Sequence, residues 1–183
     1  MNTRSAMDTA PLATLRSIEE ACRLCSAGLS AEVETASEWS GIAFRIGASN
    51  LVTPLEEVAE ILEYPEVSAV PGTQPWVHGI ANIRGNLLTV VDLGAYLGAD
   101  MTALTNRCRL LVVDHNGVCS GLLVDEVSGL KHFMHAEFCE DDICTAGFLH
   151  PFVRHGFRRG ESCWGLFSLH ALADAPQFLR VAV

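Results

Sequence analysis

The residue of this sequence best suited to specific chemistry is Arg84, which stands in a polar turn between apolar, strand-like runs at 77–83 and 87–93. Gly85 follows it and can adopt the positive φ that a tight turn requires. The flanking strands would hold the guanidinium at a fixed point, where it can form a planar, two-bonded pair with a carboxylate. Such a pair serves recognition of a partner more than catalysis. A solvated arginine in an ordinary hairpin would show the same pattern.

The cysteine and histidine side chains are the second candidate for a functional site. Cysteines and histidines crowd the carboxyl-terminal part of the chain: His132, His135, Cys139, Cys144, His150, His155 and Cys163. They lack the two close ligand pairs of a structural zinc site, so we expect no metal. The Cys-x-x-Cys pair Cys22 and Cys25 falls inside a helical pattern, where small thiols commonly pack in a core. A cytosolic thiol- or metal-based sensor built on the carboxyl-terminal crowd is the alternative function.

Other catalytic sets are missing from the sequence. It has no glycine-rich phosphate loop, no Gly-x-Ser-x-Gly elbow and no His-Glu-x-x-His motif. We therefore expect neither an enzyme nor a bound cofactor.

Composition narrows the class of partner. The formal net charge of the 183 residues is −10, and Lys131 is the only lysine, which disfavours binding to nucleic acid or to an anionic membrane. The apolar runs are far shorter than the roughly 20 residues of a membrane span. Nothing at the amino terminus resembles a secretory signal, and the 7 cysteines form no disulfide framework. We expect a cytoplasmic protein whose partners are proteins.

The elements that would position these residues fall into two parts. Residues 9–29 carry apolar side chains at helical spacing, and residues 30–38 read as an acidic linker. We therefore expect a helical extension with its linker over 1–38 and a folded domain over 39–183. The extension should pack one face of its helix against the domain, because a soluble protein avoids an exposed apolar stripe.

Short strand patterns separated by turn residues dominate the domain, which predicts a mainly β fold. The strands are expected at 42–46, 51–54, 77–83, 87–93, 109–113, 118–124 and 163–168, and short helices at 55–63, 93–97 and 169–173. Asn116 and Gly117 should form the turn of a hairpin, because this dipeptide suits the primed turn that matches strand twist.

Several stretches resemble one family. Residues 82–85 are similar to the Asn-Leu-Arg-Gly turn of the CheW family, whose members couple chemoreceptors to a CheA-type histidine kinase. Stretches 44–47, 58–62, 91–93 and 121–127 agree with the family in order. Further stretches resemble the branch of CheW-like adaptors that serves type IV pilus chemosensory systems: 39–42, 76–79, 131–133, 167–173 and 181–183. Against that branch the resemblance covers nearly the whole chain.

The resemblance implies a fold and a role. The fold would be two small, intertwined SH3-like β-barrels of five strands each, with short helices and the added amino-terminal helix. The protein would be a non-enzymatic adaptor that binds the regulatory domain of a CheA-type kinase and the cytoplasmic tip of a methyl-accepting chemoreceptor. It would be recruited to polar receptor arrays at the inner membrane and would control twitching motility.

The resemblance also implies a receptor-binding site. Glu60 matches the glutamate that accompanies the arginine of the turn, so Glu60 and Arg84 are a predicted pair, with Gly85 shaping the turn. Val58 and Gly79 match positions that line the receptor-contacting groove. Alternatives remain open, because Glu60 could be the polar face of an amphipathic element and Gly79 a strand bulge.

Overall fold

Most of the described chain forms short β-strands, as the alternating apolar pattern predicted. The computed structural model describes residues 38–140, 147–149 and 151–182. These belong to a compact unit that begins at Ser37. The predicted helix over 9–29, with Cys22 and Cys25, and the predicted linker up to residue 37 lie outside the described residues, as do Cys144 and His150. Glu38, the last residue of the predicted linker, begins the first strand.

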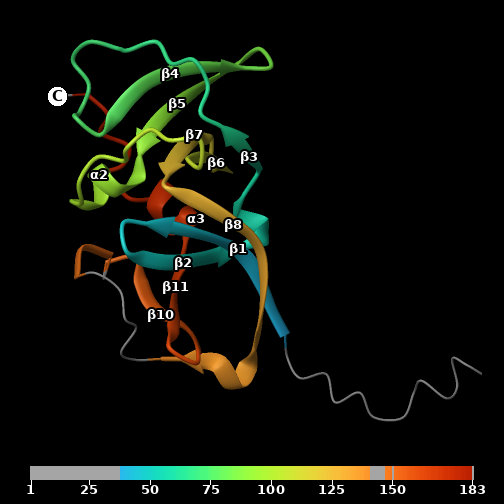
Figure 1. Ribbon diagram of the computed structural model, residues 1–183. Helices are drawn as coiled ribbons and strands as arrows, with labels where there is room; N and C mark the ends of the chain where they lie inside the picture. The colour runs from blue at the N-terminus through green and yellow to red at the C-terminus, as the bar shows by residue number, and fades with distance from the viewer. Residues whose placement is uncertain (1–37, 141–146, 150, 183) are drawn as a thin grey trace, which may run out of the picture. The chain divides into compact units, whose positions relative to one another are not determined.

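The first sheet combines strands from both ends of the unit. Its order is β8-β1-β2-β11-β10-β9. The strands are β1 (Glu38–Ile46), β2 (Ser49–Pro54), β8 (Glu126–Met134), β9 (Phe138–Cys139), β10 (Val153–Arg159) and β11 (Ser162–Phe167). Neighbouring strands run antiparallel except β2 and β11, which are parallel. Distant parts of the sequence therefore meet in this sheet (Figure 1).

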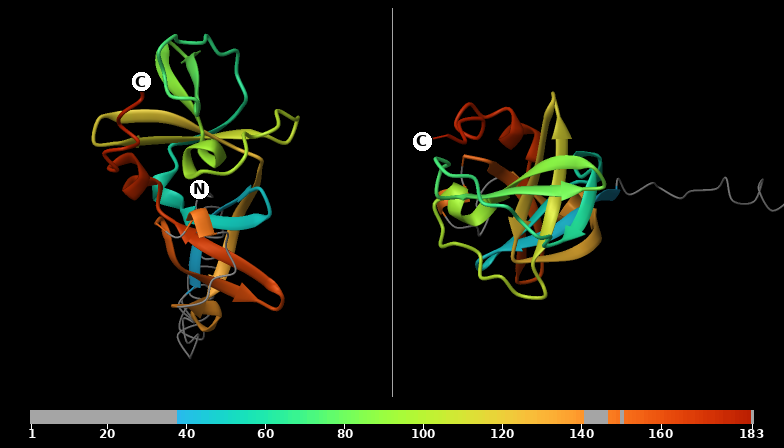
Figure 2. Two further views of the ribbon diagram at one scale, coloured as in Figure 1. Left: turned by 90° about the vertical axis from the view of Figure 1, so that its left-hand side faces the viewer. Right: turned by 90° about the horizontal axis from the view of Figure 1, so that it is seen from above.

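The second sheet is built from the middle of the chain. Its order is β3-β6-β7-β5-β4. The strands are β3 (Glu60–Glu63), β4 (Val77–Ile83), β5 (Asn86–Asp92), β6 (Arg109–His115) and β7 (Val118–Val124). Only β5 and β7 run parallel. In Figure 2 these green and yellow strands gather at one end of the unit, and the blue and orange strands of the first sheet at the other.

Five short helical segments connect the strands of the described chain. They are η1 (Leu55–Glu57), α2 (Leu93–Leu97), η2 (His135–Glu137), η3 (Gly147–Leu149) and α3 (Leu169–Ala173). Asp92 caps α2 by accepting from the amide of Ala95 at 3.0 Å. Ser168 caps α3 by accepting from the amide of Ala171 at 3.1 Å. The predicted helices at 93–97 and 169–173 are confirmed, because a polar cap stands before each apolar turn.

The structure corrects other predicted elements. Residues 55–63 do not form one helix, since η1 ends at Glu57 and residues 60–63 pair with β6 as a strand. Pairing with a neighbouring strand outweighs weak helical propensity there. Strands β8 and β10 were not predicted, because glycine and charged residues interrupt their apolar alternation.

The buried apolar side chains form three clusters, and the largest of them holds the two sheets together. The largest draws on both sheets, with Phe44 and Leu51 from the first and Leu111 and Leu122 from the second. A smaller cluster lies within each sheet. One contains Ala81, Val90, Cys108, Leu110 and Leu123, and the other Val52, Phe133 and Phe157. The mainly β fold with two small curled sheets is confirmed, although the first sheet has six strands because the two-residue β9 adds to its edge.

The helices of the described chain are short. None of them is both long and apolar enough to cross a membrane.

Candidate partner-binding site

The hairpin between β4 and β5 presents Arg84 at its tip. Ile83 pairs with Asn86, and the two residues between them have positive φ, 52° for Arg84 and 91° for Gly85. Two positive values define the primed turn that suits twisted strands. The side chain of Asn82 accepts a hydrogen bond from the amide of Gly85 at 2.9 Å. The local sequence thus fixes the turn, and the Arg84 side chain remains 78% exposed.

Glu60 reaches this tip from β3. Its Oε1 lies 2.8 Å from Nη2 of Arg84, and its side chain is 35% exposed. β3 and β4 are the two outer strands of the second sheet, so the ion pair joins its opposite edges. The contact links one nitrogen to one oxygen. The two-bonded geometry expected for Arg84 occurs instead between Arg159 and Glu137, at 2.6 and 2.8 Å.

Val58 lies between η1 and β3. Its amide donates to the carbonyl of Leu55 at 3.2 Å, which ends η1. The side chain is partly buried and packs against the large shared cluster. Val58 therefore combines a structural contact with a partly exposed position two residues before Glu60.

Backbone atoms of the loop at Ser68 fill the space that a side chain at Gly79 would need. It is buried, its φ is 142°, and a Cβ built there would lie 2.1 Å from the carbonyl oxygen of Ser68. Ser68 and Ile80 form a two-bonded bridge beside it, and the β4–β5 register shifts between Val77 and Gly79. A glycine is therefore required here because the strand is irregular and the Ser68 loop passes directly over it.

The Asn116–Gly117 turn lies on the hairpin between β6 and β7. The φ values are 51° and 80°, and His115 pairs with Val118 across the turn. The Asn116 amide donates to Asp174 at 3.0 Å, beyond the end of α3. This hydrogen bond, and then the one from His115, lower the pKa of the Asp174 carboxyl. The turn therefore ties the second sheet to α3.

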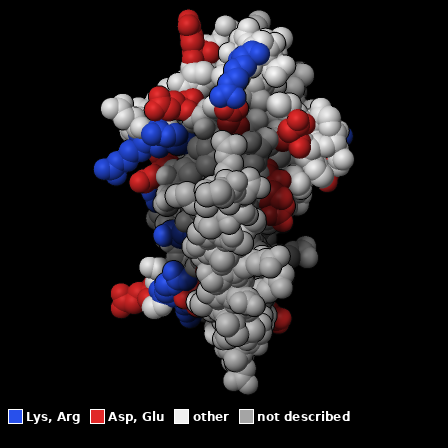
Figure 3. Space-filling model, turned by 90° about the vertical axis from the view of Figure 1, so that its right-hand side faces the viewer, with Lys and Arg blue, Asp and Glu red and all other residues white. Residues whose placement is uncertain are grey.

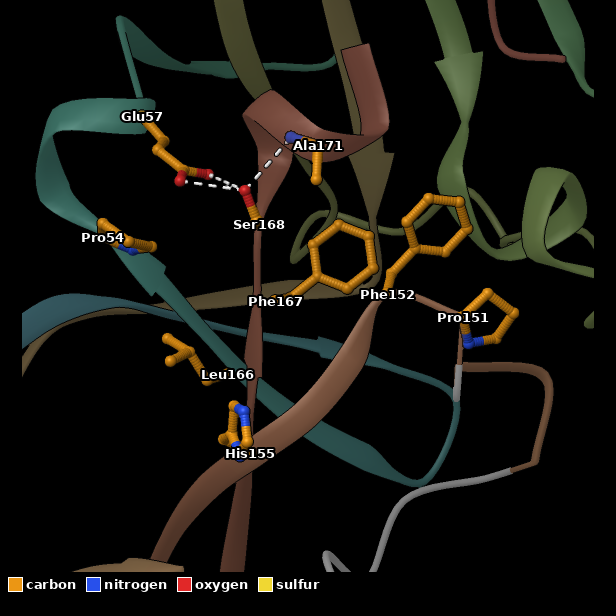
Figure 4. Close-up of a pocket in the computed structure, with 9 residues that line it drawn as sticks. All are labelled: Pro54, Glu57, Pro151, Phe152, His155, Leu166, Phe167, Ser168 and Ala171. Atoms are coloured by element: carbon orange, nitrogen blue, oxygen red, sulfur yellow. Dashed lines mark hydrogen bonds between the residues drawn. The ribbon is translucent and has the colours of Figure 1, made fainter. Parts of the chain in front are cut away.

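A pocket of about 460 Å³ lies between η1, β11 and α3 (Figure 4). It is lined by Pro54, Glu57, Pro151, Phe152, His155, Leu166, Phe167, Ser168 and Ala171. Sequence reasoning missed Glu57, whose carboxylate accepts from the Ser168 hydroxyl at 3.0 Å and the His170 amide at 3.1 Å. These donors occupy the carboxylate, so the pocket offers mainly apolar surface. The capping serine of α3 is the only local signal of this contact.

Within the part of the chain that is described, we find no site for the alternative thiol- or metal-based sensor. The cysteines of the described residues form no disulfide: they are Cys108, Cys119 and, from the carboxyl-terminal crowd, Cys139 and Cys163. No group of three or more candidate ligands among these described residues could hold a metal ion. The described part of the face in Figure 3 carries acidic side chains as well as basic ones.

These features define a class of protein. Residues 40–176 match the CheW-like domain, and the chain therefore belongs to the CheW-like family. Members of this family are non-enzymatic scaffold adaptors, so the expectation of a non-enzymatic chemosensory adaptor is confirmed.

Comparison with individual proteins shows which members of the family this chain is similar to. Protein PilI of Pseudomonas aeruginosa is 43% identical over 173 residues, covering 94% of this chain and 97% of that protein. The probable chemotaxis protein CheW of Rhizobium etli is 35% identical over 89 residues, covering 49% of this chain and 57% of that protein. The crystal structure of the scaffolding protein TtCheW from Thermoanaerobacter tengcongensis superposes with a TM-score of 0.65 at 20% identity, over 76% of this chain and 94% of that one. The last likeness concerns the fold.

Proposed function

We propose that this protein couples a methyl-accepting chemoreceptor to a CheA-type histidine kinase in a type IV pilus chemosensory system that controls twitching motility. The similarity to PilI supports this branch of the family, because it extends over 94% of the chain, whereas the similarity to the CheW protein of R. etli covers 49%. The adaptor acts in the cytoplasm, at polar receptor arrays on the inner membrane.

The receptor-contacting surface is proposed to contain Val58, Glu60 and Arg84. The observation that carries it is the Arg84–Glu60 contact of 2.8 Å on an exposed hairpin tip. An arginine held by a rigid turn and oriented by a carboxylate presents a fixed set of donors to a partner helix. Gly85 serves this surface by permitting the turn, and Gly79 by letting the Ser68 loop cross β4.

The kinase regulatory domain would bind through other loops of the protein. Affinity at such protein interfaces comes from a few central apolar anchors. The described chain exposes several large apolar side chains outside the Arg84 turn, including Met101 and Leu104 in the loop after α2. These supply the kind of anchor that a second interface requires.

Titration calorimetry tests the proposal. The probes are a soluble hairpin-tip fragment of a chemoreceptor and the regulatory domain of a CheA-type kinase, both from the same genome. Arg84→Ala should weaken receptor binding about fivefold or more, because truncating a central arginine costs more than 1 kcal/mol. Kinase binding should not change.

Arg159→Ala is the matched control, since Arg159 also forms an ion pair, but on the first sheet. It should leave both affinities unchanged. Equal receptor affinity for Arg84→Ala and wild type would refute the proposed receptor surface.

A further inference from the structure

The outer strands of the second sheet, β3 and β4, do not pair with each other. β3 pairs only with β6, and β4 only with β5, apart from the Ser68 bridge. Two side-chain contacts join one edge of the sheet to the other. They start from β3 and from the residue that follows it, and they reach β4 and its turn. Glu60 meets Arg84 at one end, and Tyr64 meets His78 at the other. We call these two contacts the β3–β4 seam.

The Tyr64 end of the seam is partly buried. The Tyr64 hydroxyl lies 2.8 Å from Nδ1 of His78, and the two rings meet edge to face at 5.9 Å. Burial, and then the charge of Asp92, raise the pKa of Tyr64, so the hydroxyl keeps its proton and can donate it to Nδ1.

Asp92 lies near the other nitrogen of the His78 ring, without a hydrogen bond to it. Its Oδ2 lies 3.6 Å from Nε2 of His78, and the carboxylate is completely buried. The amides of Ala95 and Thr102 donate to it at 3.0 and 2.7 Å. Because these bonds hold Asp92 against α2 and the following loop, the histidine has a rigid neighbour that faces its second nitrogen.

The Arg84 end of the seam is weaker by comparison. The Arg84 side chain is 78% exposed, and such exposed ion pairs contribute little to holding two elements together. Between the two ends, Leu62 and Ile83 pack against the small cluster inside the second sheet. The spacing of β3 and β4 therefore depends on the buried end and on these apolar contacts more than on the ion pair.

We propose that Tyr64 and His78 are positioning residues for Arg84, because they fix the spacing of β3 and β4 at which Glu60 can hold the guanidinium. The role in receptor binding rests on the proposed function. The positioning itself can be measured without a receptor.

Hydrogen exchange tests the positioning on the full-length protein. Tyr64→Phe removes one hydroxyl and keeps the ring, so the fold should be retained. Backbone amides of residues 82–86 should exchange about twofold to tenfold faster, the factor that one such hydrogen bond supplies. The amides of residues 115–118 in the other hairpin should not change.

Tyr96→Phe is the matched control variant. Tyr96 is the other tyrosine of the chain, also partly buried, and packs against Trp76 and Phe178. It should leave exchange at 82–86 unchanged. Unchanged exchange at 82–86 in Tyr64→Phe, or an equal increase at 115–118, would overturn the proposal, since the first means no coupling and the second a general loss of stability.

Receptor affinity then connects the seam to function. With the receptor-tip fragment as probe, Tyr64→Phe should weaken binding about twofold to tenfold and should add nothing in the Arg84→Ala background. Binding of the kinase regulatory domain should stay unchanged. Additive losses in the double variant, or equal losses for both partners, would overturn the positioning role. Wild-type receptor affinity in Arg84→Ala would refute the proposed receptor surface, while the exchange result still decides the positioning.

Discussion

At the scale of single residues, Arg84 combines a backbone set by its neighbours with a side chain left open to solvent. Its φ of 52° is uncommon for a residue with a Cβ and is accommodated because Gly85 completes the primed turn. The exposed guanidinium adds little to folding but carries five donors in a fixed plane. A substitution of Arg84 should therefore affect the binding of a partner more than the stability of the fold.

Alanine variants of Glu60 and Arg84, singly and together, test whether the pair serves binding more than stability. Each alanine variant should lower the free energy of unfolding by about 0–1 kcal/mol, because the pair is largely exposed. Each should weaken receptor binding more than that, and the double variant should lose less than the sum of the two, since either change frees the other residue. Thermal melts and calorimetry on the same samples measure both effects. Large stability losses with normal receptor binding would make the pair structural.

The Glu137–Arg159 pair predicts a pH effect. The hydrogen bonds from Arg159, then that from the Met134 amide, lower the pKa of Glu137 from 4.5 to about 2. A carboxyl whose pKa is lower in the folded state adds stability above its unfolded pKa and loses it as the pH falls. The contribution of Glu137 should thus disappear between about pH 4.5 and 2.

Glu137→Gln should flatten the pH dependence of stability in that window. Urea unfolding at several pH values measures it, and Glu161→Gln, at an exposed acidic residue in the turn before β11, is the control. An unchanged slope in Glu137→Gln would show that the pair does not contribute.

At the scale of elements, β4 depends on the absence of a side chain at Gly79. The Ser68 loop bonds to Ile80 and crosses the strand within the space that a Cβ would occupy. Because backbone atoms of a bonded loop form the obstacle, they cannot move aside as a flexible side chain would. The loop, the strand and the Arg84 hairpin are therefore linked.

Gly79→Ala should destabilise the protein by about 2 kcal/mol or more, from a close backbone contact added to an unfavourable φ. Gly98→Ala is the control, because Gly98 has a φ of 93° but no neighbour within 4 Å of the added Cβ. It should cost only about 1–2 kcal/mol, the strain term alone. Denaturant titration compares the two, and a smaller loss for Gly79→Ala than for Gly98→Ala would contradict the crowding argument.

At the scale of the described unit, the shared cluster makes the two sheets depend on each other. Phe44 and Phe167 meet edge to face with ring centres 6.1 Å apart, and the same cluster contains Leu111 and Leu122 of the second sheet. Neither sheet can bury its inner face without the other. We expect them to unfold in one transition.

Phe167→Ala should lower the free energy of unfolding by about 3–5 kcal/mol, as expected for a large cavity in a core. Two single-tryptophan variants report the result, one keeping Trp164 in the first sheet and one keeping Trp76, which leads into β4. Both probes should shift by the same amount. Separate transitions would show that the sheets fold independently.

The sequence alone determined the features that depend on a few consecutive residues. The turns at Arg84–Gly85 and Asn116–Gly117 follow from the glycine in each, which tolerates positive φ. Helices α2 and α3 follow from a polar cap before an apolar turn. The mainly β class follows from alternation, and the Glu60–Arg84 pair was reached through the family resemblance of two short motifs.

Only the tertiary structure decided how distant segments meet. Glu57 accepts from Ser168, which is 111 residues away, and β2 runs parallel to β11. Strand β3 forms because β6 offers it an edge, and Tyr64 meets His78 because the sheet curls until its outer strands approach. Local sterics act over a few residues and can be seen in the sequence. Pairing of remote strands is selected by the apolar area that the whole arrangement buries, and that area exists only once the chain has folded.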